Sequence, residues 1–137
     1  MNKTIYIFFI FVTHLVFAQI KITEKQIIFG ENQRIYIDDE LENLERFTPN
    51  LQFINLVNHL LEEKLKKENL NLDNYYIQYI GIKRLNEVLI YANASCRKEV
   101  NFETELFSYR GGGKCYFKSL NNINQNLIEK FNFNAPK

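Results

Sequence analysis

The strongest hydrophobic periodicity in the chain follows Thr48-Pro49 and extends over about twenty residues. Apolar side chains recur there at helical spacing and fall on one half of the cylinder, while polar side chains occupy the other half. Proline suits the first position of a helix, so we expect Thr48 to be the N-cap and the helix to end near Asn69. The pattern predicts an amphipathic helix of about five turns with an apolar stripe that must be buried. The stripe comprises Phe53, Ile54, Leu56, Val57, Leu60, Leu61 and Leu65.

After Asp73 the hydrophobic period changes to the alternation typical of β-strands. The expected strands cover 75–84, 88–97, a weaker 104–109, 114–120 and 127–133, with turns or loops at 85–87, 111–113 and 121–126. Alternation places Val88, Ile90, Ala92, Ala94 and Cys96 on one face, Cys115 and Phe117 on one face, and Leu127, Phe131 and Phe133 inward. The small alanines leave room for the helix to approach the sheet.

The segment before the helix is shorter and less regular. Residues 19–38 favour one or two short strands, and Asp39 followed by Glu42 resembles a capping box that opens a short helix over 40–47. The order of elements predicts an α+β fold, in which the long amphipathic helix packs on an antiparallel sheet of about four strands.

The first eighteen residues have the pattern of a secretory signal peptide. Lys3 gives a positive start, 5–12 is an unbroken apolar run, and Val16-Phe17-Ala18 is a small-residue cleavage pattern before Gln19. The alternative is a buried N-terminal strand. We expect residues 1–18 to be removed and 19–137 to form a single domain that is periplasmic or secreted. The apolar run is too short to cross a bilayer, and no cysteine stands at the cleavage site for a lipid, so no stable membrane anchor is expected after cleavage.

Composition and charge narrow the class of partner. The chain has 17 Lys and Arg, one of them in the predicted signal peptide, against 16 Asp and Glu. The mature chain is therefore close to neutral, which argues against nucleic acid as a partner. An even pair of cysteines, Cys96 and Cys115, enters an oxidising compartment, so we predict a structural disulfide; buried free thiols are the alternative.

Residues able to carry chemistry are few, and each has a structural interpretation. His59 falls on the polar face of the helix, and one histidine with two cysteines makes no zinc set. The glycine run 111–113 departs from a phosphate-binding loop at Ser108 and Cys115, and favours a turn or bulge. The acidic cluster Asp38, Asp39, Glu40, Glu42 and Glu45 offers calcium ligands, but acids are also common at a helix start. We expect no catalytic residues, metal or cofactor.

Several segments in order carry a resemblance to a known group of proteins. The signal ending Phe17-Ala18-Gln19, the strand 75–81, and 112–117 leading into 131–135 together resemble an uncharacterised group of small exported Bacteroidota proteins. Their layout is similar to cystatin-like or PepSY-like domains, so the resemblance implies a helix on a four-stranded antiparallel sheet. Asn134-Ala135 departs from the usual Asn-Gly ending of the group. Gln78-Tyr79-Ile80-Gly81 is one residue short of the motif of inhibitory cystatins, so inhibition does not transfer.

The hypothesis for function is a non-enzymatic binding or interaction module with an unknown protein or small-molecule partner. It would use the sheet face opposite the helix, because aromatic residues on alternate positions exceed what solvation would favour. The alternative is that a second layer covers this face. An inhibitor or immunity-type protein against an exported hydrolase is the second functional hypothesis, and an enzyme the third. The expected binding face comprises Tyr75, Tyr79, Leu89, Tyr91 and Tyr116.

Overall fold

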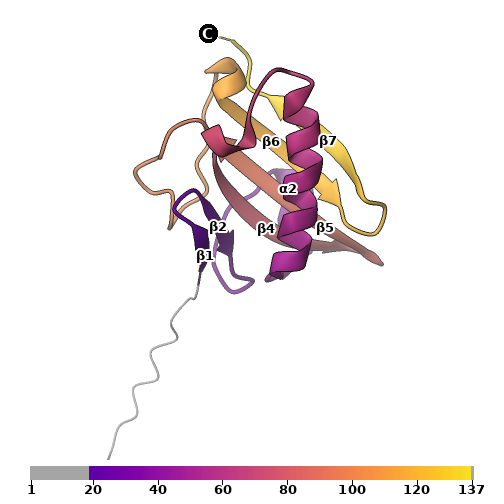
Figure 1. The fold of residues 1–137 in the computed structure, drawn as a ribbon. Helices are drawn as coiled ribbons and strands as arrows, with labels where there is room; N and C mark the ends of the chain where they lie inside the picture. The colour runs from indigo at the N-terminus through magenta and orange to yellow at the C-terminus, as the bar shows by residue number, and fades with distance from the viewer. Residues whose placement is uncertain (1–18, 137) are drawn as a thin grey trace, which may run out of the picture.

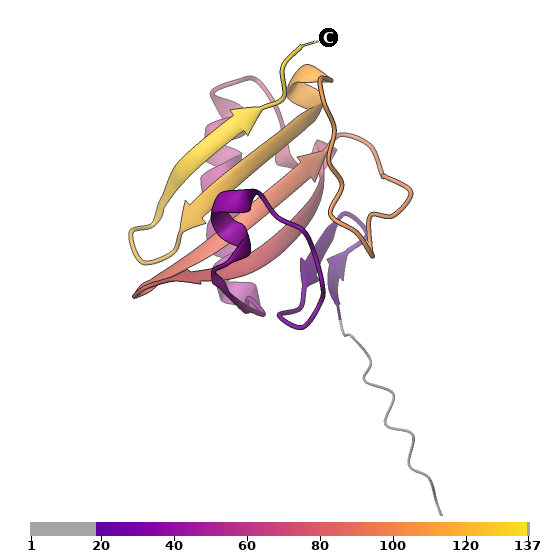
Figure 2. The same cartoon turned by 180° about the vertical axis from the view of Figure 1, so that it is seen from behind.

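The computed structural model describes residues 19–136, so the predicted signal peptide at 1–18 lies outside the described residues. One long helix crosses a twisted sheet, and shorter segments lie on the other side of that sheet (Figures 1 and 2). The strands are β1 Ile20–Thr23, β2 Gln26–Phe29, β3 Glu45–Phe47, β4 Tyr76–Arg84, β5 Glu87–Ser95, β6 Tyr116–Asn122 and β7 Leu127–Phe133. The helices are α1 Asp39–Glu42 and α2 Leu51–Lys66, with 3-10 turns η1 Leu72–Asn74 and η2 Gly113–Cys115.

The sheet is mixed and has seven strands, more than the expected four. Its order is β1-β2-β4-β5-β6-β7, and β4 to β7 form an antiparallel meander. The outer edge of β4 is shared by two short strands: β2 pairs with it in parallel from Ile77 to Ile80, and β3 pairs with it antiparallel from Gly81 to Lys83. The segment before α2 therefore completes the sheet and caps the β4 edge.

The amphipathic stripe of α2 faces the sheet, as its periodicity predicts, but only part of it is buried: Ile54, Val57, Leu61 and Leu65 are fully buried, whereas Phe53, Leu56 and Leu60 are partly exposed. Its fully buried side chains pack on one face of the four central strands, and Tyr79 donates a hydrogen bond from its hydroxyl to Asn58 of the helix. The helix starts later than expected, because the N-cap is Asn50, whose Oδ1 accepts the Phe53 N–H at 2.9 Å. This helix-side core comprises Ile28, Ile54, Val57, Leu61, Leu65, Leu72, Tyr75, Ile77, Tyr79, Ile90, Ala92, Ala94 and Phe117.

The sheet face opposite α2, called the back face below, carries a second core. Two segments with little regular structure, 30–44 and 96–110, lie over β4 and β5 on this side (Figure 2). Their apolar side chains, above all Ile37 and Phe102, are buried against the sheet. The back-side core comprises Ile27, Phe29, Ile37, Ile80, Ile82, Leu89, Tyr91, Phe102 and Leu120. The alternative of a second covered face is thus the correct one for β4 and β5.

Three expected elements differ from the structure. The helix predicted over 40–47 ends at Glu42, because 45–47 pairs with the edge of β4 instead. The strand predicted over 104–109 is absent, since this segment serves as cover for the back face. The loop predicted over 121–126 begins two residues later, because Asn121 and Asn122 are buried members of β6.

A bulge in β7 explains a fourth difference. The register shifts between Leu120 and Asn121, which pair with Lys130 and Ile128, so Glu129 is an extra residue in β7. The extra residue places Ile128 with Phe131 and Phe133 against the helix-side core and leaves Leu127 39% exposed. The prediction that Phe131 and Phe133 face inward is confirmed, whereas that for Leu127 is wrong.

Within residues 19–136, no helix combines the length and the apolar content that crossing a bilayer requires. The longest helix is α2, with 16 residues and one polar side.

Gly81 should tolerate no side chain, because it lies opposite Phe47 at the β3–β4 junction. A Cβ built on Gly81 would lie 2.4 Å from the Phe47 carbonyl oxygen, which belongs to the backbone and cannot swing aside. We expect Gly81→Ala to lower the free energy of unfolding by about 2 kcal/mol, measured by urea denaturation. Asn86→Ala, in the exposed β4–β5 turn, is the control, and equal stability of the two variants would contradict the packing described here.

Candidate functional site

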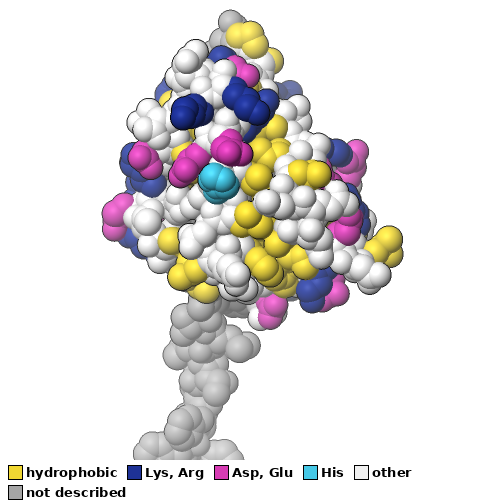
Figure 3. Space-filling model, turned by 45° about the vertical axis from the view of Figure 1, so that its right-hand side comes forward, with side chains coloured by type: hydrophobic (Ala, Val, Ile, Leu, Met, Phe, Trp, Pro, Cys, Tyr) yellow, Lys and Arg dark blue, Asp and Glu magenta, His cyan; other side chains and the backbone are white. Residues whose placement is uncertain are grey.

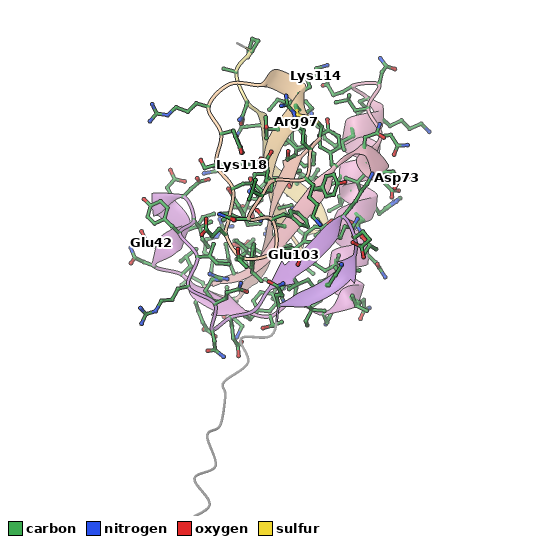
Figure 4. The ribbon with its side chains drawn as sticks, turned by 90° about the vertical axis from the view of Figure 1, so that its left-hand side faces the viewer. Glu42, Asp73, Arg97, Glu103, Lys114 and Lys118 are labelled. Atoms are coloured by element: carbon green, nitrogen blue, oxygen red, sulfur yellow. A yellow bond between two sulfur atoms is a disulfide. The ribbon has the colours of Figure 1, made fainter. Side chains whose placement is uncertain are left out.

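A groove crosses the part of the back face that the covering segments leave open. It consists of two adjoining hollows, of about 110 Å³ beside α1 and about 280 Å³ beside residues 105–108, and both are lined by Asp38 and Lys118. Lys118 lies on β6 between α1 and the 96–110 segment (Figure 4). The groove is therefore built from three separate parts of the chain: residues 34–41, residues 105–108 and the strands β5 to β7.

The first wall is α1, which two ion pairs tie to the sheet. Asp38 Oδ1 lies 3.0 Å from Lys118 Nζ on β6, and Glu40 Oε2 lies 2.7 Å from Lys130 Nζ on β7. Hydrogen bonding to Glu40 raises the pKa of Lys130 above its usual range, so its ammonium group stays charged at neutral pH. Ile37 anchors this wall from below, because its side chain is buried in the back-side core.

The floor is apolar apart from one hydroxyl. Tyr91 of β5 and Leu120 of β6 are paired across the strands and both are buried. The Tyr91 hydroxyl donates to Asp38 Oδ2 at 3.4 Å. Burial, with a smaller contribution from the charge of Asp38, raises the pKa of the Tyr91 phenol well above its usual range, so the hydroxyl remains a hydrogen-bond donor at physiological pH.

The second wall, residues 96–110, is held by two buried side-chain amides rather than by strand pairing. Gln78 Nε2 donates to the carbonyls of Phe102 and Glu105, both at 2.7 Å. Asn93 Nδ2 donates to Gln78 Oε1 at 3.0 Å and to the Phe107 carbonyl at 2.8 Å. The two amides, neighbours across β4 and β5, thereby satisfy the backbone of a segment that has no ladder of its own.

The same wall is fixed at its ends by a carboxylate and a disulfide. Glu99 accepts hydrogen bonds from Ser95 Oγ at 3.0 Å, from Tyr116 OH at 3.2 Å and from Tyr109 OH. The sulfurs of Cys96 and Cys115 lie 1.96 Å apart, at disulfide-bonding distance, as the sequence analysis predicts. Cys96 is exposed, which excludes the alternative of two buried thiols.

Amides line the open end of the groove on β7 and just beyond it. Asn134 is engaged, because its Nδ2 donates to the carbonyls of Tyr109 at 2.7 Å and Gly111 at 3.0 Å. Asn132 is exposed and pairs across the strands with Lys118. The open rim thus presents Lys118, Lys130 and the Asn132 amide from adjacent positions on two strands.

The five residues expected to form an exposed binding face are buried, and they do not form one surface. Tyr75 and Tyr79 belong to the helix-side core, because β4 presents these side chains toward α2. Leu89 and Tyr91 belong to the back-side core, and Tyr116 is 8% exposed beneath Tyr109. Only Tyr91 reaches the groove, as part of its floor. The expectation of outward exposure is therefore wrong, because distant segments cover those positions.

Other residues considered from sequence lie away from the groove or have structural partners. His59 is exposed on α2, 3.8 Å from Glu63 (Figure 3). Gly112 has a φ of +86°, and a Cβ there would lie 2.6 Å from the Tyr116 ring, so this glycine serves the turn before η2. In the acidic cluster, Asp38 and Glu40 form ion pairs with lysines, and Glu45 lies 2.7 Å from Lys83. Residues 19–136 contain no group of acids, histidines and cysteines able to hold a metal.

The arrangement is suited to binding by charge, hydrogen bonding and apolar contact. The hydroxyl of Ser119 is engaged by Asn121 Nδ2 at 3.0 Å, and the described lining of the groove contains no histidine or cysteine. Sequence reasoning missed Lys118, Lys130 and Asn132. The available signal was that polar residues interrupt the apolar alternation of β6 and β7 on one face.

Loss of the disulfide should weaken the fold, because the bond closes a long loop that carries one wall of the groove. We expect the double variant Cys96→Ser with Cys115→Ser to lose about 3 kcal/mol of unfolding free energy in urea, from the added freedom of the unfolded chain. The single variants should lose a similar amount. Unchanged stability of the oxidised protein and the double variant would refute a structural role.

Alkaline pH should destabilise the protein partly through Tyr91. Its pKa is raised in the folded state, so its contribution is fully present below the ordinary tyrosine pKa of about 10 and is lost as pH rises beyond that value. We expect Tyr91→Phe to flatten the fall in unfolding free energy between about pH 10 and pH 12, followed by urea denaturation at each pH. A slope identical to that of the unmodified protein would contradict this assignment.

The groove is the feature on which a functional assignment can be based. Its walls come from segments with no regular pattern, and its floor and rim from the central strands. Comparison of the chain with protein-family models, curated proteins and solved structures finds no match.

Proposed function

We propose that this chain is a non-enzymatic binding module of the periplasm or cell exterior, and that it takes an acidic segment of a protein partner in the groove. The observation that carries the proposal is the pair of lysines on adjacent strands, Lys118 and Lys130, each already holding a carboxylate of α1. The chain's own Asp38 and Glu40 therefore show which chemical group this rim accepts.

Exchange of the Glu40 carboxylate for that of a partner costs little, whereas Asp38 is held more firmly because it also accepts from the buried Tyr91 hydroxyl. The side chains of Glu40 and Lys130 are 77% and 60% exposed, and exposed ion pairs of this kind stabilise a fold only weakly. A partner carboxylate can additionally accept from the exposed Asn132 amide. The described lining has equal numbers of acidic and basic side chains, so an acidic ligand is favoured where its carboxylate replaces that of Glu40 on Lys130.

The dimensions of the groove indicate an extended segment rather than a free metabolite. The 110 Å³ hollow has room for one carboxylate-bearing side chain and is below the size of ordinary small-molecule sites. The adjoining hollow of 280 Å³ is lined by Ile35, Leu106 and Phe107, which suit an apolar side chain. An acidic residue followed by an apolar one matches the two hollows.

The disulfide supports the proposed compartment. Stable disulfides belong to oxidising environments, and Cys96 and Cys115 are paired. The second hypothesis, an inhibitor or immunity-type protein, also requires binding to a partner in this compartment. If the partner bound at the groove is an exported hydrolase, the chain has the narrower role of an inhibitor or immunity-type protein.

Reversal of the two lysine charges tests the proposal. We expect Lys118→Glu with Lys130→Glu to reduce capture of the partner from periplasmic or medium proteins at least tenfold, measured by quantitative mass spectrometry of the bound fraction, because the acidic segment is then repelled. Lys66→Glu with Lys67→Glu, on the exposed end of α2, is the matched control. The proposal fails if both double variants fold and capture the same proteins in equal amounts.

A further inference from the structure

The tip of the β4–β5 hairpin carries a leucine in a position that the fold itself does not favour. Leu85 is the first residue of the two-residue turn that joins the paired Arg84 and Glu87. Its φ is +54° and it is 98% exposed. It lies away from the groove, which none of the turn residues lines.

Leucine is unsuited to this site in two independent ways. A side chain with a Cβ rarely adopts a positive φ, and glycine or asparagine is the usual residue there in two-residue hairpin turns. A fully exposed leucine also contributes no burial to the core. Asparagine follows directly, as Asn86, and an asparagine or glycine at position 85 would suit the turn better. The fold therefore does not explain this leucine.

The base of the hairpin is firmly held, so the tip projects as a fixed element. The Arg84 guanidinium lies 2.6 Å from Glu87 and 2.7 Å from Glu129, which links β4, β5 and β7. Asn122 Nδ2 donates to both of those glutamates, at 2.9 and 2.8 Å. The hairpin end extends past the β6–β7 turn in both opposite views (Figures 1 and 2).

The charged groups near the tip are paired within the chain. Arg84 is paired with Glu87 and Glu129, and Lys83 binds Glu45 at 2.7 Å. The tip therefore offers a partner one apolar side chain on a rigid base whose charged groups are already paired. Rigid presentation lowers the entropic cost of binding, and a single leucine fits a pocket the size of one side chain.

From this combination we propose that Leu85 is an anchor residue that inserts into an apolar pocket on a protein partner. The backbone strain and the solvent exposure are retained because burial of the leucine in the complex compensates for them. The interaction surface is the hairpin tip, and the kind of partner that fits it is a protein with an apolar pocket the size of one side chain.

The diagnostic experiment is one substitution with opposite effects on stability and on binding. Leu85→Asn should raise the melting temperature of the full chain by roughly 3–6 °C, because asparagine tolerates the left-handed backbone. The probe for binding is a lysine-reactive cross-linker added to exporting cells, which joins Lys83 to a bound partner. Leu85→Asn should reduce the discrete cross-linked species on the order of tenfold to a hundredfold, as expected for loss of one buried leucine.

Two further variants make the result specific. Val100→Asn removes an equally exposed apolar side chain elsewhere and should leave the cross-linked species unchanged. Leu85→Met keeps an apolar side chain and should still yield the cross-linked species. The proposal is overturned if the unmodified chain yields no discrete cross-linked species, or if Leu85→Asn yields as much of that species as the unmodified chain. It is also overturned if Val100→Asn loses the species to the same extent as Leu85→Asn, or if Leu85→Asn melts no higher than the unmodified chain. Groove variants at Lys118 and Lys130 separate failure here from failure of the proposed function.

Discussion

The rest of the structure depends on the burial of the β4–β5 hairpin on both faces. Every residue from Ile77 to Ile82 and from Leu89 to Ser95 is buried, so each strand needs cover on two sides. The amphipathic helix α2 supplies one layer. The other layer comes from segments 30–44 and 96–110, which have little regular structure and must be anchored by single apolar side chains and by the Gln78 and Asn93 amides. The groove lies where this second layer ends.

Periodic parts of the fold could be predicted from the sequence, and the irregular cover could not. The α2 stripe and the strands β4, β5 and β7 follow patterns that local sequence specifies. The side chains of Leu89 and Tyr91 alternate with those facing the helix, which suggested exposure to solvent. Two of the residues that cover this face are Phe102, which stands among polar residues, and Ile37, which ends the short apolar run 35–37. Neither pattern indicates where these side chains pack.

The candidate site was harder to predict for the same reason. Its ion pairs join Asp38 to Lys118 and Glu40 to Lys130, which are 80 and 90 positions apart in the chain. The acidic cluster was visible in the sequence, and acids are common at the start of a helix. That interpretation concerns only neighbouring residues, so it gave no indication of a lysine partner on β6. The cysteine pair was predictable because only one intramolecular pairing exists for two cysteines. The bulge at Glu129, which decides where Leu127 points, leaves no mark in the alternation of β7.

The parallel pairing of β2 with β4 has a consequence for the order in which the molecule assembles. Residues 26–29 find their partner strand only at 77–80, so the hairpin of β1 and β2 cannot dock while the chain emerges amino end first. Ile27 and Phe29 stay exposed until the central hairpin exists, because they are synthesised before the strand that they pair with. This segment is thus made before the strand that holds it in place, and a nascent chain must be kept from aggregating through it during that interval.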